Sequence, residues 1–167
     1  MAKILIPLNQ SELSQQVLPV VESLFPPEGN QLVLFYITNP PGTAGFGVPD
    51  LSAGYVPQPG DANLRATLHP IYSSQQEDSI RAHVHAELSP VTQRLEAAGY
   101  KVKVRVGFDT DPVDAIARLH VNHSFDLIAM STIGRVGVTR FFFRSIADTL
   151  AQQEQLPVLQ VHPPSGD

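Results

Sequence analysis

The residues whose types and spacing could do chemistry lie in one segment, residues 130–148, with the sequence MSTIGRVGVTRFFFRSIAD. Gly134 and Gly137 would let the backbone approach a bound anion closely. Ser145 begins a predicted helix, and the free N–H groups at a helix start favour a phosphate-like ligand. The segment has no Asp or Glu before its last residue, and its arginines are Arg135, Arg140 and Arg144. This basic bias in an acidic chain predicts a site for a phosphate-like anion.

A purely structural interpretation of the same residues stays open. Ser145 and Asp148 have the spacing of a capping box, so Ser145 could serve its helix alone. The glycines could only shape a turn, and the arginines could be solvated or paired with a second copy of the chain. The run 141–143, three phenylalanines, fits packing in the core or a dimer interface better than stacking on a base.

Alternating strands and helices must position this segment. Apolar runs predict strands at residues 3–7, 31–38, 101–106, 126–130 and 156–161. Helical spacing predicts helices over about 11–24, 73–98, 112–122 and 145–153. The order predicts one α/β domain over residues 1–163, a five-stranded parallel sheet with helices on both faces, followed by a flexible tail at 164–167. In such sheets ligands bind at the switch point, here the turns after the first and fourth strands.

Local signals refine this outline. Asp111 is a predicted N-cap, Gly99 a predicted helix end, and the alternating run 101–106 a strand with one solvated face near a sheet edge. Pro19 predicts a kink or local adjustment in the first helix, and Pro90 a kink or restart in the second.

A stretch at about residues 39–72 is rich in proline and glycine and shows no helical or strand period. It is therefore predicted to be a long loop, of the kind that is usually functional or mobile in a domain of this size.

Composition narrows the class of protein. Hydrophobic residues make up 43% and charged residues 16% of 167 residues, which is ordinary for a globular domain. A net charge of −5 disfavours nucleic acid as a partner. The absence of cysteine excludes disulfides, thiolate metal sites and thiol catalysis. No apolar stretch approaches the length of a membrane helix or a signal-peptide core, so we expect a cytoplasmic protein.

Catalytic and metal sites have no support in the sequence. His120 and His123 share a face of a predicted helix, but no further ligand stands at a telling spacing, and surface histidines are the better interpretation. The chain has no Walker lysine motif and no nucleophile elbow. We therefore expect no catalytic residue and no metal site, and at most a very slow ATPase activity.

Several segments, taken together and in order, resemble the universal stress protein family. They are KILIPLNQSELSQQVL, LVLFYIT, GFDTDPVDAIARL, DLIAMSTIGRVGVTRFFFRSIADTL and LPVLQVHP. The resemblance covers nearly the whole chain except residues 39–70 and the tail. It implies a Rossmann-like sandwich related to the adenine nucleotide alpha hydrolase-like folds. It also implies a stress-response role and a homodimer formed through the last strand, Pro157 to Val161.

Family members that bind ATP typically carry G-x-x-G, nine further residues, and then G-S or G-T. On this chain the pattern falls on Ser131, Gly134, Arg144 and Ser145. The second glycine and the serine are retained, whereas serine and arginine replace the other two glycines. Residues 9–11, Asn-Gln-Ser, stand where the family usually has Asp-Gly-Ser.

The resemblance implies a site for ATP or AMP, with Mg²⁺ if the ligand is ATP. Its implied lining is Pro7, Asn9, Ile37, Met130, Ser131, Gly134, Arg135, Gly137, Arg144, Ser145 and Ile146. A side chain at 131 narrows the space for a ligand, and Arg144 either obstructs phosphate or offers it a forked donor. Two hypotheses follow: a nucleotide-binding family member with weakened or altered affinity, and one that acts through protein contacts without nucleotide. A small phosphate-handling enzyme is a third, weaker hypothesis.

Overall fold

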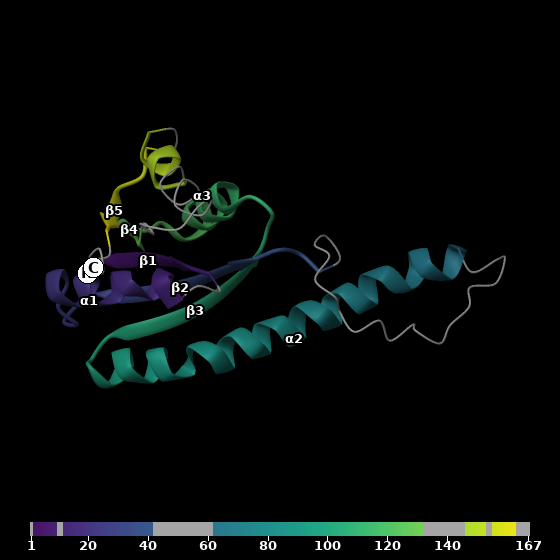
Figure 1. The fold of residues 1–167 in the computed structure, drawn as a ribbon, viewed down its shortest axis with the longest axis horizontal. Coiled ribbons are helices and arrows are strands. Elements are labelled where there is room, and N and C mark those ends of the chain that lie inside the picture. The colour runs from purple at the N-terminus through teal and green to yellow at the C-terminus, as the bar shows by residue number, and fades with distance from the viewer. Residues whose placement is uncertain (1, 10–11, 42–61, 132–145, 153–154, 163–167) are drawn as a thin grey trace, which may run out of the picture.

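The computed structural model describes residues 2–9, 12–41, 62–131, 146–152 and 155–162. Its five strands are β1 (Lys3–Leu8), β2 (Gln31–Thr38), β3 (Lys101–Phe108), β4 (Leu127–Ser131) and β5 (Val158–Val161). They form one parallel sheet in the order β3-β2-β1-β4-β5 (Figure 1). The predicted five-stranded parallel sheet is confirmed.

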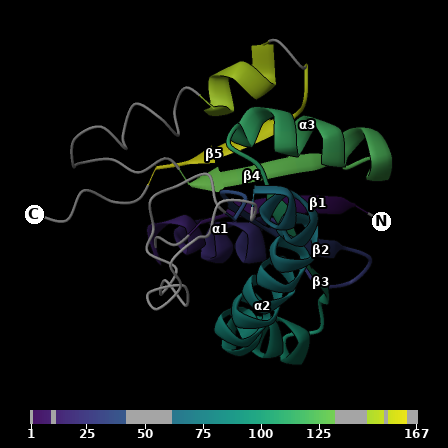
Figure 2. The ribbon, with the colours of Figure 1, turned by 90° about the vertical axis from the view of Figure 1, so that its right-hand side faces the viewer.

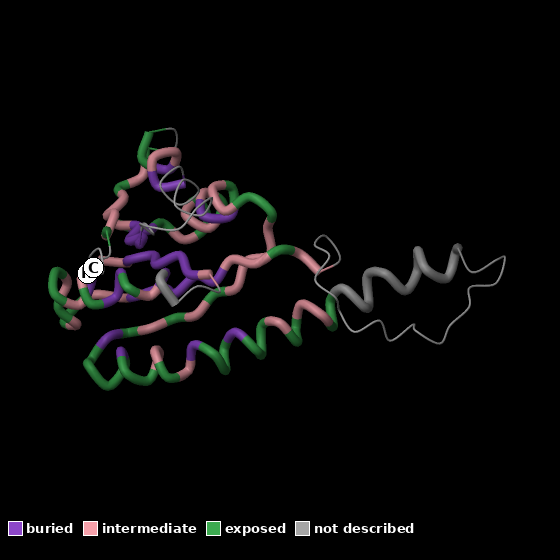
Figure 3. Tube along the Cα trace, in the orientation of Figure 1, coloured by how far each residue is buried: buried purple, intermediate pink, exposed green. Residues whose placement is uncertain are grey.

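The strands differ in burial according to their place in the sheet. β1 and β2 read as continuous apolar runs because both of their faces are covered, and they are largely buried in Figure 3. β3 alternates between exposed and half-buried residues and pairs with β2 alone among the described strands, so the predicted edge strand with one solvated face is confirmed.

Helices cover both faces of the sheet (Figure 2). Described helical elements are η1 (Glu12–Gln16), α1 (Val17–Leu24), α2 (Ala62–Ala97), α3 (Pro112–His123) and residues 146–152. Successive residues of β1 belong to opposite faces: Ile4 and Ile6 pack with α1 and α2, whereas Leu5 packs with α3 and residues 146–152. None of the described helices has the length and apolar character needed to cross a bilayer.

The second helix begins earlier than predicted. α2 starts at Ala62, so the loop predicted over residues 39–72 extends too far, and its residues 42–61 lie outside the described structure. Figure 1 shows α2 continuing past the end of the sheet. A helical segment that covers no sheet needs no apolar face. The sequence prediction identified helices by apolar residues at helical spacing, so it missed this segment.

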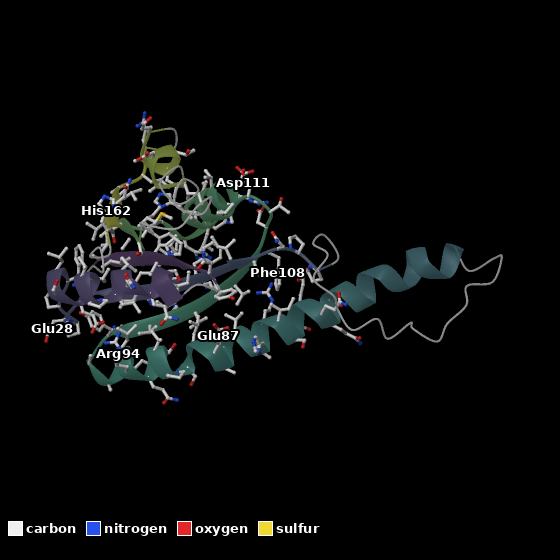
Figure 4. All side chains as sticks on the ribbon, viewed as in Figure 1. Glu28, Glu87, Arg94, Phe108, Asp111 and His162 are labelled. Atoms are coloured by element: carbon white, nitrogen blue, oxygen red, sulfur yellow. The ribbon has the colours of Figure 1, made fainter. Side chains whose placement is uncertain are left out.

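Pro90 does not restart α2, which is helical on both sides of it. Leu88 and Leu95 are almost fully buried against the sheet, so packing before and after Pro90 outweighs the hydrogen bond that a proline removes. Arg94 also holds the end of α2 to α1 through two hydrogen bonds to Glu22 of 2.8 and 2.9 Å (Figure 4 labels Arg94).

Three other local predictions can be placed. Pro19 is the third residue of α1, within the first turn where no N–H is needed, and the preceding turn is the 3₁₀ helix η1. Asp111 caps α3, with its carboxylate accepting from the N–H groups of Val113 and Asp114. Gly99 follows α2 with a φ of +99°, as expected at a helix end.

Candidate functional site

The switch point of the sheet lies between β1 and β4. β1 pairs with β2 along one edge and with β4 along the other, and because both pairings are parallel, the carboxyl ends at Leu8 and Ser131 belong to the same end of the sheet. After β1 the chain enters η1 and α1 on one face, whereas residues 146–152 pack on the opposite face. The switch point, where the prediction places the site, is therefore at the carboxyl ends of β1 and β4.

Ser131, the last residue of β4, is the most unusual group at this edge. Its side chain is 4% exposed, and within the described part of the chain its hydroxyl has no hydrogen-bond partner. Buried polar groups are nearly always paired, because an unpaired one loses its bonds to water without replacement. The hydroxyl therefore has an unused donor and acceptor at the switch point.

Asn9 and Ser14 shape the neighbouring turn after β1. The Asn9 N–H donates to Ser14 Oγ at 3.4 Å, and Ser14 is itself buried in η1, which packs against β4. Sequence analysis did not identify Ser14. The sequence pattern indicates that Ser14 is buried, because it lies on the same side of the helical segment as the apolar Val17, Leu18 and Val21. A buried polar residue requires a hydrogen-bond partner.

Four apolar residues of the predicted site come together on the other face. Met130 and Ile146 are buried in the cluster beneath α3, and Ile37 packs against that cluster. Pro7 is buried two residues after Leu5 on the same face of β1, opposite Phe35 in register.

Tyr36 is a titratable group at this end of the sheet that sequence analysis also missed. It is buried and stands opposite Leu8 in register. Burial raises the pKa of Tyr36, and the negative charge of Glu87 on α2 raises it further. The group is therefore a neutral phenol at physiological pH.

The rest of the predicted site falls outside the described residues. These positions are Gly134, Arg135, Gly137, Arg144 and Ser145. The phenylalanine run and residues 10–11 lie outside them as well. For these positions the roles given above stay predictions.

The two histidines of α3, His120 and His123, both contact Phe125. His120 Nδ1 accepts from the Phe125 N–H at 3.3 Å, and the rings of His120 and His123 both lie near the Phe125 ring. Nowhere in the described ranges do three or more His, Asp or Glu side chains come together as a metal site would require.

Solved structures resemble this fold over nearly their whole length. One is a universal stress protein family member from Burkholderia pseudomallei, 20% identical, with 96% of this chain and 95% of that chain covered and a TM-score of 0.59. Another is a universal stress protein in complex with cAMP, 16% identical, 96% of each chain covered, TM-score 0.58. A third is a family member from Arabidopsis thaliana with AMP bound, 10% identical, 99% and 93% covered, TM-score 0.57. At these identities the likeness establishes the fold.

A comparison with curated protein sequences finds no match. The family model described as "Universal stress protein family" matches residues 1–162, which is nearly the whole chain. The sheet order, the switch point and this match agree, and the chain belongs to the universal stress protein family.

Proposed function

We propose that the protein binds an adenine nucleotide, ATP or AMP, or a related anion, at the carboxyl ends of β1 and β4. The observation that carries the proposal is the Ser131 hydroxyl, buried at the switch point without a partner among the described residues. Leaving such a group unsatisfied costs about 1–3 kcal/mol. A ribose hydroxyl or a phosphate oxygen would satisfy it, so the site is completed by a polar ligand.

The surroundings of Ser131 suit the two halves of a nucleotide. Pro7, Ile37 and Met130 are apolar residues near the carboxyl ends of their strands, and with Asn9, which follows β1, they are the proposed contacts of the base. Two structures with this fold were solved with an adenine nucleotide, one with cAMP and one with AMP. If the ligand is ATP, Mg²⁺ would bind mainly through its phosphates.

Ser131 stands where the family's motif has a glycine, so its contact with the ligand would be made by the side-chain hydroxyl and not by the backbone. A glycine allows the backbone to touch the ligand, whereas a serine side chain occupies that space and offers a hydroxyl. We expect binding that depends on the Ser131 hydroxyl and is weaker than an intact motif would give.

Calorimetric titration of the nucleotide-stripped protein with ATP and AMP, with and without Mg²⁺, tests the proposal. We expect saturable binding that Ser131→Ala weakens about two- to tenfold, the range of one hydrogen bond. Ser23→Ala is the matched control, because Ser23 is exposed on α1 and bonds only the local Val20 carbonyl. No heat from the folded protein would overturn the proposal and favour the family member that acts through protein contacts.

The same titration decides the role of Arg144. Arg144→Gly restores the family's glycine, so it strengthens ATP binding if the arginine obstructs the site. It weakens binding if the guanidinium is a phosphate ligand. Unchanged affinity would contradict both roles.

We also propose that the protein forms a homodimer through Pro157 to Val161. β5 is the outermost strand beside β4, and none of the other described strands pairs with its second edge. Light scattering on the purified protein should give the mass of two chains, and a monomer would refute this assembly. A cytoplasmic stress-response role with at most a very slow ATPase activity is the corresponding expectation.

A further inference from the structure

β3 carries three basic side chains on one face, Lys101, Lys103 and Arg105, named here the basic row. All three are exposed. The intervening residues Val102 and Val104 pack in the opposite direction, against the cluster beneath α1 and α2. Strand alternation therefore places every cation of the row on the same side of the sheet, in a protein whose net charge is −5.

The cations of the basic row differ from the other basic side chains that the structure describes. No ion pair or hydrogen bond joins them to any described residue. The others each have a partner: Lys3 with the His123 carbonyl, Arg81 with Glu77, Arg94 with Glu22, and Arg118 with Asp109. Within the described chain, unpartnered positive charge is thus concentrated on one strand.

The row has a defined length and period. At its carboxyl end, the Phe35 ring covers Gly107, where a Cβ atom would meet Phe35 Cζ at 2.6 Å. Arg81 closes the same end, donating to the Val106 carbonyl at 3.1 Å and lying over the Phe108 ring, which Figure 4 labels. Within the row, successive cations are two residues apart, about 6.6 Å along a parallel strand. An extended peptide beside β3 repeats its side chains at the same interval.

We propose that the basic row binds an extended acidic segment of a partner protein, with a carboxylate at every second residue. β3 is an edge strand that pairs only with β2 among the described strands, so a segment can lie along it. Matching periods place each carboxylate against one cation, and the charges give the segment its register.

The row's charge argues against two other occupants. Antiparallel pairing with a second copy of β3 would place Lys103 opposite Lys103 and Lys101 opposite Arg105, which like charges oppose. A nucleic acid has many more phosphates than the three cations can neutralise. The remaining phosphates would be repelled by a protein that is acidic overall. Phe35, which stands opposite Arg105 in register, is only 4% exposed and offers little surface for base stacking.

Fluorescence anisotropy with a labelled nine-residue peptide, glutamate alternating with threonine or valine, tests the proposal. We expect saturable binding that weakens as ionic strength rises. Lys103→Gln should weaken it about two- to fivefold, and the triple change of Lys101, Lys103 and Arg105 to glutamine more than about tenfold. Arg118→Gln removes an exposed cation from α3 and is the matched control, with no effect expected. Circular dichroism verifies that each variant is folded.

Three results would overturn the proposal. The first is no saturable binding of the alternating peptide by the wild-type protein. The second is equal binding of a peptide with the same composition but with its glutamates in one block. That result would show that binding does not depend on a carboxylate at every second residue. The third is tighter binding of a single-stranded oligouridylate of matched charge, which would assign the row to nucleic acid.

Discussion

The two ends of the β1–β4 pair are built differently. At the amino end, the Lys3 N–H donates to the Asp126 carboxylate at 2.7 Å, and the Asp126 N–H donates to the Lys3 carbonyl at 2.9 Å. The Lys3 ammonium donates to the His123 carbonyl at 2.6 Å and lies over the Phe125 ring. At the carboxyl end, Ser131 is buried without a partner in the described structure, and the Asn9 N–H reaches Ser14 only at 3.4 Å.

The amino end of this strand pair therefore contributes mainly to stability, and the carboxyl end is the part proposed to bind a ligand. Paired polar groups at the amino end hold β1 against β4. The carboxyl end keeps an unsatisfied hydroxyl, which lowers stability but preserves a polar contact for another molecule. Substitutions at the two ends should therefore change different properties of the protein.

The largest effect is expected at the amino end. Asp126→Ala should lower the free energy of unfolding by about 1–2 kcal/mol, because it removes a charge-assisted bond to the Lys3 N–H at an exposed position. Urea unfolding measures the change, and nucleotide titration should show unaltered affinity. The control is Asp78→Ala on the exposed surface of α2, expected to stay within about 0.5 kcal/mol of wild type. An Asp126 variant that loses affinity but not stability would reverse the comparison.

A smaller effect of opposite sign is expected at the carboxyl end. Ser131→Ala should leave stability unchanged or raise it by up to about 1 kcal/mol, because no bond is lost and a buried polar group is removed. Ser14→Ala is the matched change at a buried serine that does accept a bond, and it should lower stability by about 0.5–1.5 kcal/mol. Both are read from urea unfolding without nucleotide. Equal losses from the two variants would mean that the Ser131 hydroxyl is satisfied in solution.

The smallest effect appears only at high pH and should be alike near the carboxyl end of β2, at Tyr36, and near the amino end of β3, at Tyr100. Burial raises the pKa of Tyr36 above 10, with a further contribution from Glu87. Burial also raises the pKa of Tyr100, just before β3, with contributions from Glu22 and Glu28. Because each pKa is higher in the folded state, the stabilisation is complete below pH of about 10 and is lost as pH rises above it.

The alkaline effect is measured by urea unfolding at several pH values. Tyr36→Phe should reduce the loss of stability above pH of about 10, since phenylalanine cannot ionise. Tyr100→Phe should do the same but also cost stability at neutral pH, because its hydroxyl donates to the Phe25 carbonyl at 2.7 Å. An unchanged alkaline slope in both variants would contradict this explanation.

Strand positions were the most predictable part of the fold. β2 begins and ends where its apolar run does, and the alternation of β3 predicted its place at an edge. The start of α2 was wrong, because the segment before residue 73 lacks the apolar period on which the prediction depended. The predicted restart at Pro90 was wrong, because packing on both sides of it, which local rules do not include, keeps α2 helical.

For the candidate site, the sequence predicted a switch point in the sheet but not the buried hydroxyl, unpartnered among the described residues, that lies there. Strand order placed the switch point after the first and fourth strands, and the structure shows that these two strands are neighbours in the sheet. The sequence marked Ser131 only as a replaced glycine. Its burial without a hydrogen-bond partner in the described structure is a tertiary property, and no local sequence pattern could reveal it.

The central place of β1 has a consequence for how the protein is made. The contact of Lys3 with Asp126 spans 123 residues, whereas β1 pairs on its other edge with the much nearer β2. At a synthesis rate of about 5–20 residues per second, the β4-facing edge of β1 waits about 6–25 s for its partner. During that time an almost fully apolar strand has one open edge, and open strand edges favour aggregation of incompletely folded chains.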